Sequence, residues 1–241
     1  MCASLRSVVP DAEPYARFIA ASGEPALELG CGDGDPLLDL RERGLAVEGL
    51  DSSADMLARC RAAAETRGVE VVLHHQPIET MDLEKRYRSI FLAGPTFNLL
   101  ADDDTAGRAL QRIHAHLEPG GSALIPLFVP TPTPAVQLGR FREHRDPDGV
   151  LMRFALVAEE RDEQVRLQTG QVRYELGDGD GETVRLDRAW VLHWHTQVGF
   201  RSLADAAGLT TVRVLRPDAT PAAPTDTEFV FVLRREPGPK Q

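Results

Sequence analysis

The sequence has few cysteines, few aromatic side chains and no long apolar run. Its three cysteines are an odd number and too scattered for a disulfide framework, which indicates a reducing cytoplasm. No apolar run approaches the ~18 residues that span a bilayer, and the first residues lack the apolar core of a signal peptide. We therefore expect a cytoplasmic location and no association with a membrane.

The chain also has fewer basic than acidic residues. The 241 residues include 27 Lys and Arg against 37 Asp and Glu, which gives a formal net charge of −10. Because nucleic-acid-binding proteins usually present a basic face, this balance argues against a nucleic-acid partner. A hydrophobic fraction of 42% and a charged fraction of 27% exclude disordered and collagen-like chains. The remaining expectation is an enzyme or binding protein for a small molecule, and a homodimer is left open.

From residue 25 onward, short apolar runs alternate with amphipathic stretches, which is typical of a parallel sheet with helices on both faces. Strands are expected at residues 26–29, 45–50, 69–73, 89–93 and 122–125. Ser52 and Asp55 resemble a capping box and predict the start of a helix, and the acidic run 102–104 predicts another. Pro126 argues against a long central strand, because proline lacks a backbone donor for the sheet.

The composition changes at Pro130, where alternating Thr and Pro over residues 131–134 indicate a stiff connector. Antiparallel strands are expected at 151–157, 165–176 and 183–195, then a helix at 196–207 and closing strands at 211–215 and 229–233. The predicted fold is α/β: a doubly wound, mostly parallel seven-stranded sheet with helices on both faces and an antiparallel β insertion after the fifth strand. The expected domains are a core of residues 1–129 and 190–235, an insertion of residues 130–189 and a flexible tail of residues 236–241.

A glycine-rich turn, Gly-Cys-Gly-Asp-Gly at residues 30–34, follows the first expected strand. Glycines permit positive φ angles and a close approach of the backbone to a ligand, and the start of the next helix offers free N–H groups. A dinucleotide fingerprint would require a third glycine where this chain has Asp35. The carboxylates of Asp33 and Asp35 would repel a pyrophosphate, so the turn favours a cationic ligand.

Asp51 lies 51 − 30 = 21 residues after Gly30, at the end of the second expected strand. A carboxylate in that place can accept hydrogen bonds from the two hydroxyls of a ribose. Together with Glu28 and the glycine turn, it specifies a nucleoside that carries a positive charge. S-adenosylmethionine, with its ammonium and sulfonium groups, has that chemistry.

Three segments, residues 26–34, 49–57 and 117–121, resemble the signature segments of class I S-adenosylmethionine-dependent methyltransferases, in the family's order and spacing. The resemblance covers roughly residues 10–128 and 190–234. It implies that S-adenosylmethionine is the cofactor, that S-adenosylhomocysteine is the product, and that the chain is a methyltransferase of small molecules. The insertion of residues 130–190 is similar to the antiparallel substrate lids of methyltransferases from sugar and natural-product pathways.

The same resemblance implies a set of site residues. Gly30 and Gly32 would pack against the methionine part, Glu28 would lie near its ammonium, and Asp51 would hold the ribose. Where the family commonly has an acidic residue for the adenine amino group, this chain has Gln76, so the contact is made by Gln76 or by backbone. The full cofactor set is Glu28, Gly30, Cys31, Gly32, Asp51, Ser52, Met56, Gln76, Pro77, Ile78, Ala93 and Gly94. Tyr15, in the N-terminal helix, and Asn98, after the fourth strand, are the expected substrate-binding residues.

The catalytic candidates are His193 and His195. In a strand, residues two apart share a face, so the two histidines would lie on the side opposite Trp190 and Trp194. The tryptophan side is expected to face the core, which leaves the histidines toward solvent or the active-site cleft. A hydroxyl acceptor would need a base, for which either histidine would serve, whereas an amine need only be held unprotonated. No metal site is expected, because this His-x-His pair lacks a third ligand nearby in the sequence.

Other classes of protein stay open. A nicotinamide-dependent (NAD(P)) oxidoreductase would need the missing third glycine. A tRNA or protein methyltransferase would share the core but usually has a basic face or an Asn-Pro-Pro-type motif, and neither is present. A non-catalytic regulator that binds the cofactor would look the same in sequence.

Overall fold

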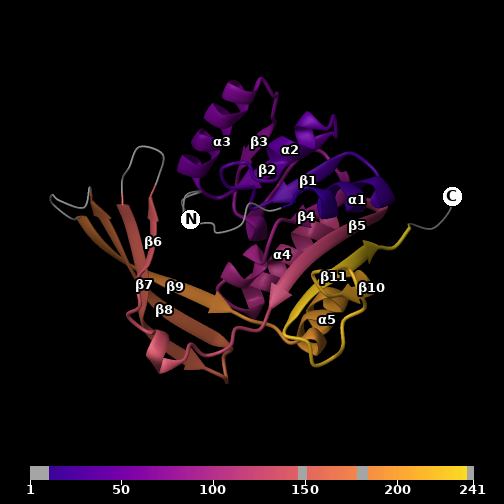
Figure 1. The fold of residues 1–241 in the computed structure, drawn as a ribbon. Helices are drawn as coiled ribbons and strands as arrows, with labels where there is room; N and C mark the ends of the chain where they lie inside the picture. Colours follow the sequence, from indigo (N-terminus) through magenta and orange to yellow (C-terminus); the bar gives the residue numbers. More distant parts are fainter. Residues whose placement is uncertain (1–10, 146–150, 178–183, 238–241) are drawn as a thin grey trace. The chain divides into compact units, whose positions relative to one another are not determined.

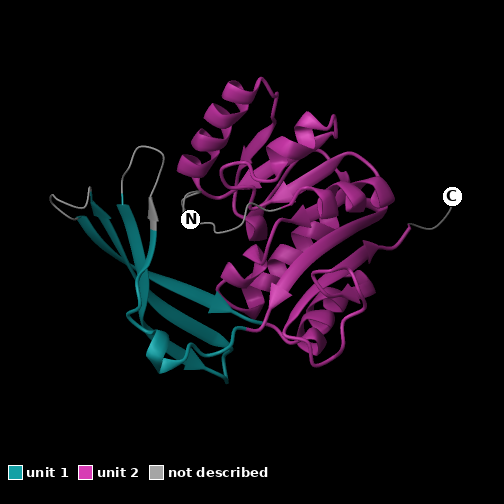
Figure 2. Cartoon of the chain, viewed as in Figure 1, with its two compact units in different colours: residues 1–8, 130–194 teal, residues 9–129, 195–241 magenta. Residues whose placement is uncertain are grey.

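The computed structural model describes residues 11–145, 151–177 and 184–237. The chain divides into two compact units (Figure 2). Unit 1 comprises residues 1–8 and 130–194, and unit 2 comprises residues 9–129 and 195–241. Within the described residues, no helix is long and apolar enough to cross a membrane.

Unit 2 is built on a seven-stranded sheet with the strand order β10-β11-β5-β4-β1-β2-β3 (Figure 1). The strands run parallel except for β11, which is antiparallel to both of its neighbours. Their bounds are β1 Ala26–Leu29, β2 Val47–Asp51, β3 Leu73–His75, β4 Tyr87–Leu92, β5 Leu117–Phe128, β10 Leu209–Leu215 and β11 Glu228–Arg235. The predicted mostly parallel, seven-stranded α/β sheet is therefore confirmed.

Helices cover both faces of this sheet. Strand alternation in β1 sends Leu27 and Leu29 into the core beneath α4 and α5, and Ala26 into the core beneath α1, α2 and α3. The helices are α1 Glu13–Ser22, α2 Leu37–Glu42, α3 Ala54–Arg67, α4 Asp103–His116 and α5 Gln197–Ala206, with short 3-10 turns η2 Ile78–Thr80, η3 Thr96–Leu99 and η4 Ala135–Gln137. Because β1 and β4 are neighbours whose helices lie on opposite faces, a ligand crevice is expected at their carboxyl ends.

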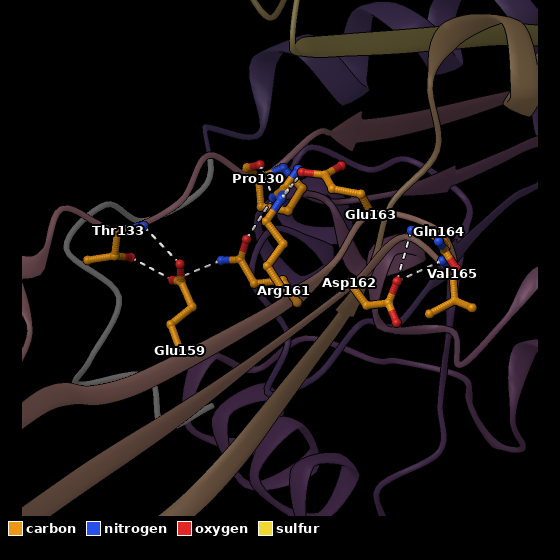
Figure 3. A network of polar contacts seen from close by, with 9 residues as sticks. Pro130, Thr133, Glu159, Arg161, Asp162, Glu163, Gln164 and Val165 are labelled. Atoms are coloured by element: carbon orange, nitrogen blue, oxygen red, sulfur yellow. Dashed lines mark hydrogen bonds and ion pairs between the residues drawn. The ribbon is translucent and has the colours of Figure 1, made fainter.

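Unit 1 is a four-stranded antiparallel sheet in the order β6-β7-β8-β9. Its strands are β6 Arg142–Arg145, β7 Leu151–Asp162, β8 Leu167–Gly177 and β9 Val184–His193. Figure 3 shows how strand β7 is hydrogen-bonded to residues 130–133, which precede the sheet in the sequence. Arg161 donates to the Pro130 carbonyl, and Glu159 accepts hydrogen bonds from Thr133. The same guanidinium lies 4.0 Å from the centre of the Trp194 ring. Arg161 thus contacts both Pro130 and Trp194, the first and last residues of the stretch 130–194.

Several predicted boundaries are wrong, each for a local reason. The third strand forms only at Leu73–His75, because as an edge strand it extends no further than its pairing with the end of β2. The cap of α3 is Ser53, whose Oγ accepts from Met56 N at 3.3 Å, and not Ser52. β5 continues through Pro126, because beyond Leu124 it pairs with β11 alone and a missing N–H is tolerated.

The antiparallel insertion also differs in detail. Strand β6, which carries the charged segment Arg142–Arg145, was not predicted, because it lacks an apolar alternation. The strand expected at 183–195 ends at His193. The connection between the strands expected at 165–176 and 183–195, and the end of the tail, lie partly outside the described residues.

Candidate active site

The glycine turn lies at the carboxyl end of β1 and is tied back to β2. The N–H groups of Gly30 and Cys31 donate to the Leu50 carbonyl at 2.7 and 3.1 Å. Gly30 has φ 71° and Gly32 has φ 55°, both in the left-handed region. A Cβ on Gly30 would lie 2.7 Å from Thr96 Cγ2, so a side chain there would push into the loop after β4. Thr96 therefore occupies the space beside Gly30, and this close approach requires glycine at that position.

Asp51 joins the end of β2 to this turn. Its Oδ2 accepts from Gly32 N at 2.8 Å, and its Oδ1 accepts from Ser53 N at 2.8 Å. A carboxylate has about four lone-pair sites, so each oxygen keeps capacity for one further donor. The two backbone N–H groups fix the orientation of the carboxylate, and the remaining capacity matches the two hydroxyls of a ribose.

Glu28, Tyr15 and Gly94 form a second part of the site. Glu28 is fully buried at the centre of the sheet. The Tyr15 ring stacks on Phe91, with centroids 5.2 Å apart, and its hydroxyl lies near the backbone of Gly94. Burial, followed by the Glu28 carboxylate, raises the pKa of Tyr15 to about 12, so the phenol stays neutral. A buried carboxylate beside neutral polar groups is a suitable place for an ammonium.

Cys31 lies inside the turn but has no nucleophilic character. It is fully buried. Burial first, and then the nearby Glu28 carboxylate, raise the pKa of its thiol well above the usual range. A thiol that stays protonated is a packing group, which agrees with the place of Cys31 in the core beneath α1, α2 and α3.

The expected adenine side is formed by the segment after β3 and the start of α3, where Ser52 and Met56 lie. The Gln76 N–H donates to the Asp51 carbonyl at 3.1 Å, which holds the two segments together. The Gln76 side-chain amide is used elsewhere, because its Oε1 accepts from Asp82 N at 2.7 Å. Pro77 is exposed and Ile78 is 8% exposed in η2. The sequence left open whether the adenine amino group would contact the Gln76 side chain or the backbone. Because the side chain already binds Asp82, this arrangement favours the backbone.

His193 and His195 do not share one strand face. β9 ends at His193, and Trp194 and His195 are both buried, while Val191 is 43% exposed. The strand that was expected to carry both histidines therefore ends before Trp194 and His195, and the alternation applies only as far as His193. His193 belongs to unit 1 and His195 to unit 2.

Within unit 2, His195 contacts a carboxylate and two aromatic rings. Its Nδ1 lies 3.5 Å from Asp103 Oδ1, in the first turn of α4. Its ring packs against Phe97 and Phe200, with centroids 6.0 and 5.9 Å away. Asp103 was missed by the sequence analysis, which read residues 102–104 together as a helix cap. Only Asp102 has that role, accepting from Thr105 N at 2.7 Å.

Asn98 is buried in η3 and joins two loops at the carboxyl edge of the sheet. Its Nδ2 donates to the Phe128 carbonyl at 2.9 Å, and its Oδ1 accepts from Phe128 N at 3.3 Å. These two bonds hold the loop after β4 to the end of β5. A contact between Asn98 and a substrate stays a prediction.

The strand order, the glycine turn after β1 and the carboxylate at the end of β2 together define a class I, Rossmann-like methyltransferase fold. A family model described as "Methyltransferase domain" matches residues 26–121. This stretch contains the turn, Asp51 and the loop after β4. The resemblance to class I S-adenosylmethionine-dependent methyltransferases that the sequence motifs carry is thereby confirmed.

Two curated proteins are similar to part of this chain, and both are methyltransferases by name. The dTDP-3-amino-3,6-dideoxy-alpha-D-glucopyranose N,N-dimethyltransferase of Streptomyces fradiae is 33% identical over 99 residues, covering 41% of this chain and 37% of that protein. The chain thus matches well under half the length of the curated relatives it resembles, at 37% and 40%.

Solved structures extend the likeness over nearly the whole chain. The CcbJ methyltransferase from Streptomyces caelestis has a TM-score of 0.75 at 23% identity, covering 94% of this chain and 90% of that one. CalS10, an amino pentose methyltransferase from Micromonospora echinaspora, has a TM-score of 0.67 at 23% identity, with 93% and 89% coverage. At these identities the likeness shows the fold.

Proposed function

We propose that the protein is an S-adenosylmethionine-dependent methyltransferase that methylates an amino group of a small, sugar-containing metabolite. The proposal rests on one observation: Glu28, the glycine turn and Asp51 lie together at the carboxyl ends of β1 and β2. The amino-sugar acceptor is supported by the S. fradiae relative and by the amino pentose methyltransferase CalS10. A hydroxyl acceptor is the second candidate, because His195 beside Asp103 could serve it as a base.

The residues present fit the cofactor. Bound S-adenosylmethionine supplies a methyl group that the sulfonium charge has already activated. Asp51 would accept hydrogen bonds from the ribose hydroxyls, and Glu28 with Tyr15 would receive the ammonium. The bare backbone at Gly30 and Gly32 would let the methionine part approach closely. The work of the protein is then mainly alignment of acceptor and methyl group and exclusion of water.

An amine acceptor that carries a proton at neutral pH must lose it before transfer, because the nitrogen needs its lone pair to attack the methyl group. Asp103 near Nδ1 favours the imidazole tautomer with its proton on that atom, which leaves Nε2 as the basic nitrogen. We therefore assign His195 as the group that accepts the proton of the acceptor, with Asp103 orienting the ring. His193 stays a second candidate.

The remaining parts of the proposal come from the sequence. Unit 1 would act as the lid over the acceptor. The few scattered cysteines support a cytoplasmic location, and the acidic composition argues against a nucleic-acid partner.

Calorimetric titration with S-adenosylhomocysteine, and separately with NAD(P), tests the cofactor assignment. Binding of the former and no heat with the latter are expected. Incubation with S-adenosylmethionine and matched pairs of nucleotide-linked sugars, one amino and one hydroxyl at the same carbon, tests the acceptor by mass spectrometry. Methylation of the hydroxyl sugars alone would overturn the amine assignment, and binding of NAD(P) alone would overturn the cofactor.

A further inference from the structure

A cavity of about 1040 Å³ lies in unit 2 on the face of the sheet that α1 partly covers. Its lining does not include Gly30, Gly32 or Asp51 but does include Tyr15 and Gly94, so the cavity adjoins the ammonium side of the candidate cofactor site and extends from there along the sheet. One wall is α1, which packs against β4 and β5, and the other is β10 with the turn that follows it.

Strand alternation gives this groove an apolar floor. The residues of β5 and β11 on the floor are Leu124, Pro126, Phe128, Val230 and Val232. Their neighbours in the sequence, such as Ile125 and Phe231, point to the opposite face and belong to the core beneath α4 and α5. The floor follows β5 from Ser122 to Phe128, a length of about 20 Å at the usual rise of a strand.

The groove is basic, although the chain as a whole is acidic. Its lining contains Arg17, Arg88, Arg213, Arg216 and Arg234 against the two carboxylates of Asp218 and Glu228. Arg17 and Arg216 are paired with Glu13 and Asp226, so the excess of positive charge comes from the other three arginines. The formal net charge of the chain is −10. A local positive potential on an acidic protein favours an anionic ligand at that place.

Three of these arginines gather at one end of the groove, which we call the cationic end: Arg88, Arg213 and Arg234. Arg234 is in register with Ser122 of β5, and Arg213 with Val232, two residues before Arg234. The register of β10 and β11 shifts between Thr211 and Arg213, and both arginine side chains line the groove. Arg88 precedes the β4 residue that pairs with Ser122. Within the described part of the chain, Arg213 and Arg234 form no ion pair, and Arg88 has only a 3.9 Å contact with Glu118.

We propose that this groove binds a small amphipathic anion, with an elongated apolar body along Leu124, Pro126 and Val230 and a single anionic head at the cationic end. A wholly apolar ligand would leave the arginines without a partner, and an inorganic anion would leave the apolar floor in water.

The test is calorimetric titration of the full chain with decanoate and with decyl phosphate, both below their micelle concentrations. Decanol provides the body without the charge, and acetate provides the head without the body. Saturable binding of one or both decyl anions is expected, with decanol and acetate much weaker. Equal binding of decanol would show that the arginines take no part and would overturn the proposal.

Variants locate the site. Arg213→Gln combined with Arg234→Gln should weaken decyl-anion binding by about tenfold or more, the scale of lost charge-assisted hydrogen bonds. Arg108→Gln, on the exposed side of α4 and outside the groove, is the matched control and should not change it. Val230→Trp fills the floor and should abolish binding with the far-ultraviolet circular dichroism unchanged. Undiminished binding by the double variant would overturn the proposal.

The other occupants give different results. If the wild-type chain is a dimer by light scattering and Val230→Trp makes it monomeric, the face is an interface between copies. If anionic vesicles bind the chain and the monomeric decyl anions do not, the groove faces a lipid surface. Either result would replace the small-ligand assignment.

Discussion

The backbone N–H of Gly32 donates a 2.8 Å hydrogen bond to Asp51 Oδ2, which joins the turn after β1 to the end of β2. The bond fixes the carboxylate and the turn in one arrangement before any ligand binds. Preorganisation of this kind lowers the entropic cost of binding. Both residues can therefore be tested through the affinity for S-adenosylhomocysteine alone, without knowledge of the acceptor.

Asp51→Ala should weaken S-adenosylhomocysteine binding by roughly 1.5–3 kcal/mol, the scale of lost hydrogen bonds to a charged group. That loss corresponds to about ten- to a hundredfold in the dissociation constant measured by calorimetry. Asp55→Ala is the matched control, because Asp55 is an exposed carboxylate on the first turn of the adjacent helix α3. An unchanged affinity in Asp51→Ala would remove the ribose assignment.

Gly32→Val should abolish detectable binding of S-adenosylhomocysteine. A β-branched residue is strained at φ 55°, and its side chain would occupy the ligand side of the turn. Gly68→Val is the control: Gly68 has φ 67° with nothing within 4 Å of an added Cβ, so it carries similar strain at the end of α3. We expect the control to lose stability and keep its affinity. Equal affinity in both variants would make the turn purely structural.

His195→Ala should lower kcat by about 10²- to 10⁴-fold while leaving cofactor affinity unchanged, as expected for loss of a general base. The wild-type rate should fall as the pH is lowered, because a protonated imidazole cannot accept a proton, and the variant should lose this dependence. Asp103→Asn should lower kcat less. His193→Ala is the comparison variant. Full kcat in both histidine variants would mean that the enzyme works by alignment alone.

Glu48 connects β2 to two neighbouring segments and gives a stability prediction. Its carboxylate accepts hydrogen bonds from His74 Nε2 and Tyr87 Oη, both at 2.8 Å, and from Lys85 Nζ at 2.5 Å. Burial raises the pKa of Glu48, but the hydrogen bonds from Lys85, His74 and Tyr87 together hold it below its usual value.

Glu48→Gln should therefore lower the free energy of unfolding by about 2 kcal/mol near neutral pH. Because the folded-state pKa is depressed, this contribution is present above the pKa of the unfolded chain and is lost as the pH falls through the folded value. Denaturant unfolding as a function of pH measures the difference between variant and wild type, which should shrink in acid. Glu42→Gln, at an exposed 3.5 Å pair with Arg67, should change stability by less than ~0.5 kcal/mol. A pH-independent difference for Glu48→Gln would contradict the assignment.

Much of the fold and the cofactor half of the site could be predicted, because their signals are local in the sequence. The turn at residues 30–34 and Asp51 each follow a short apolar strand, and parallel strands carry such residues to one edge of the sheet. Helix α4 begins where Asp102 predicts it, since a cap acts within three residues. The strands at the edges of the two sheets were less predictable. The bounds of β3 and β6 depend on where their partner strands end and not on their own apolar pattern.

The sequence by itself determined the class of the sheet, the glycine turn and the carboxylate after β2. Only the tertiary structure decided that Asp103 meets His195, 195 − 103 = 92 residues away, and that Thr96 closes on Gly30. It also decided that Asn98 is held by Phe128, and that three arginines from β4, β10 and β11 gather at one end of an apolar groove. Backbone propensities and caps act over a few residues, whereas these contacts depend on which strands become neighbours and on which face each side chain emerges.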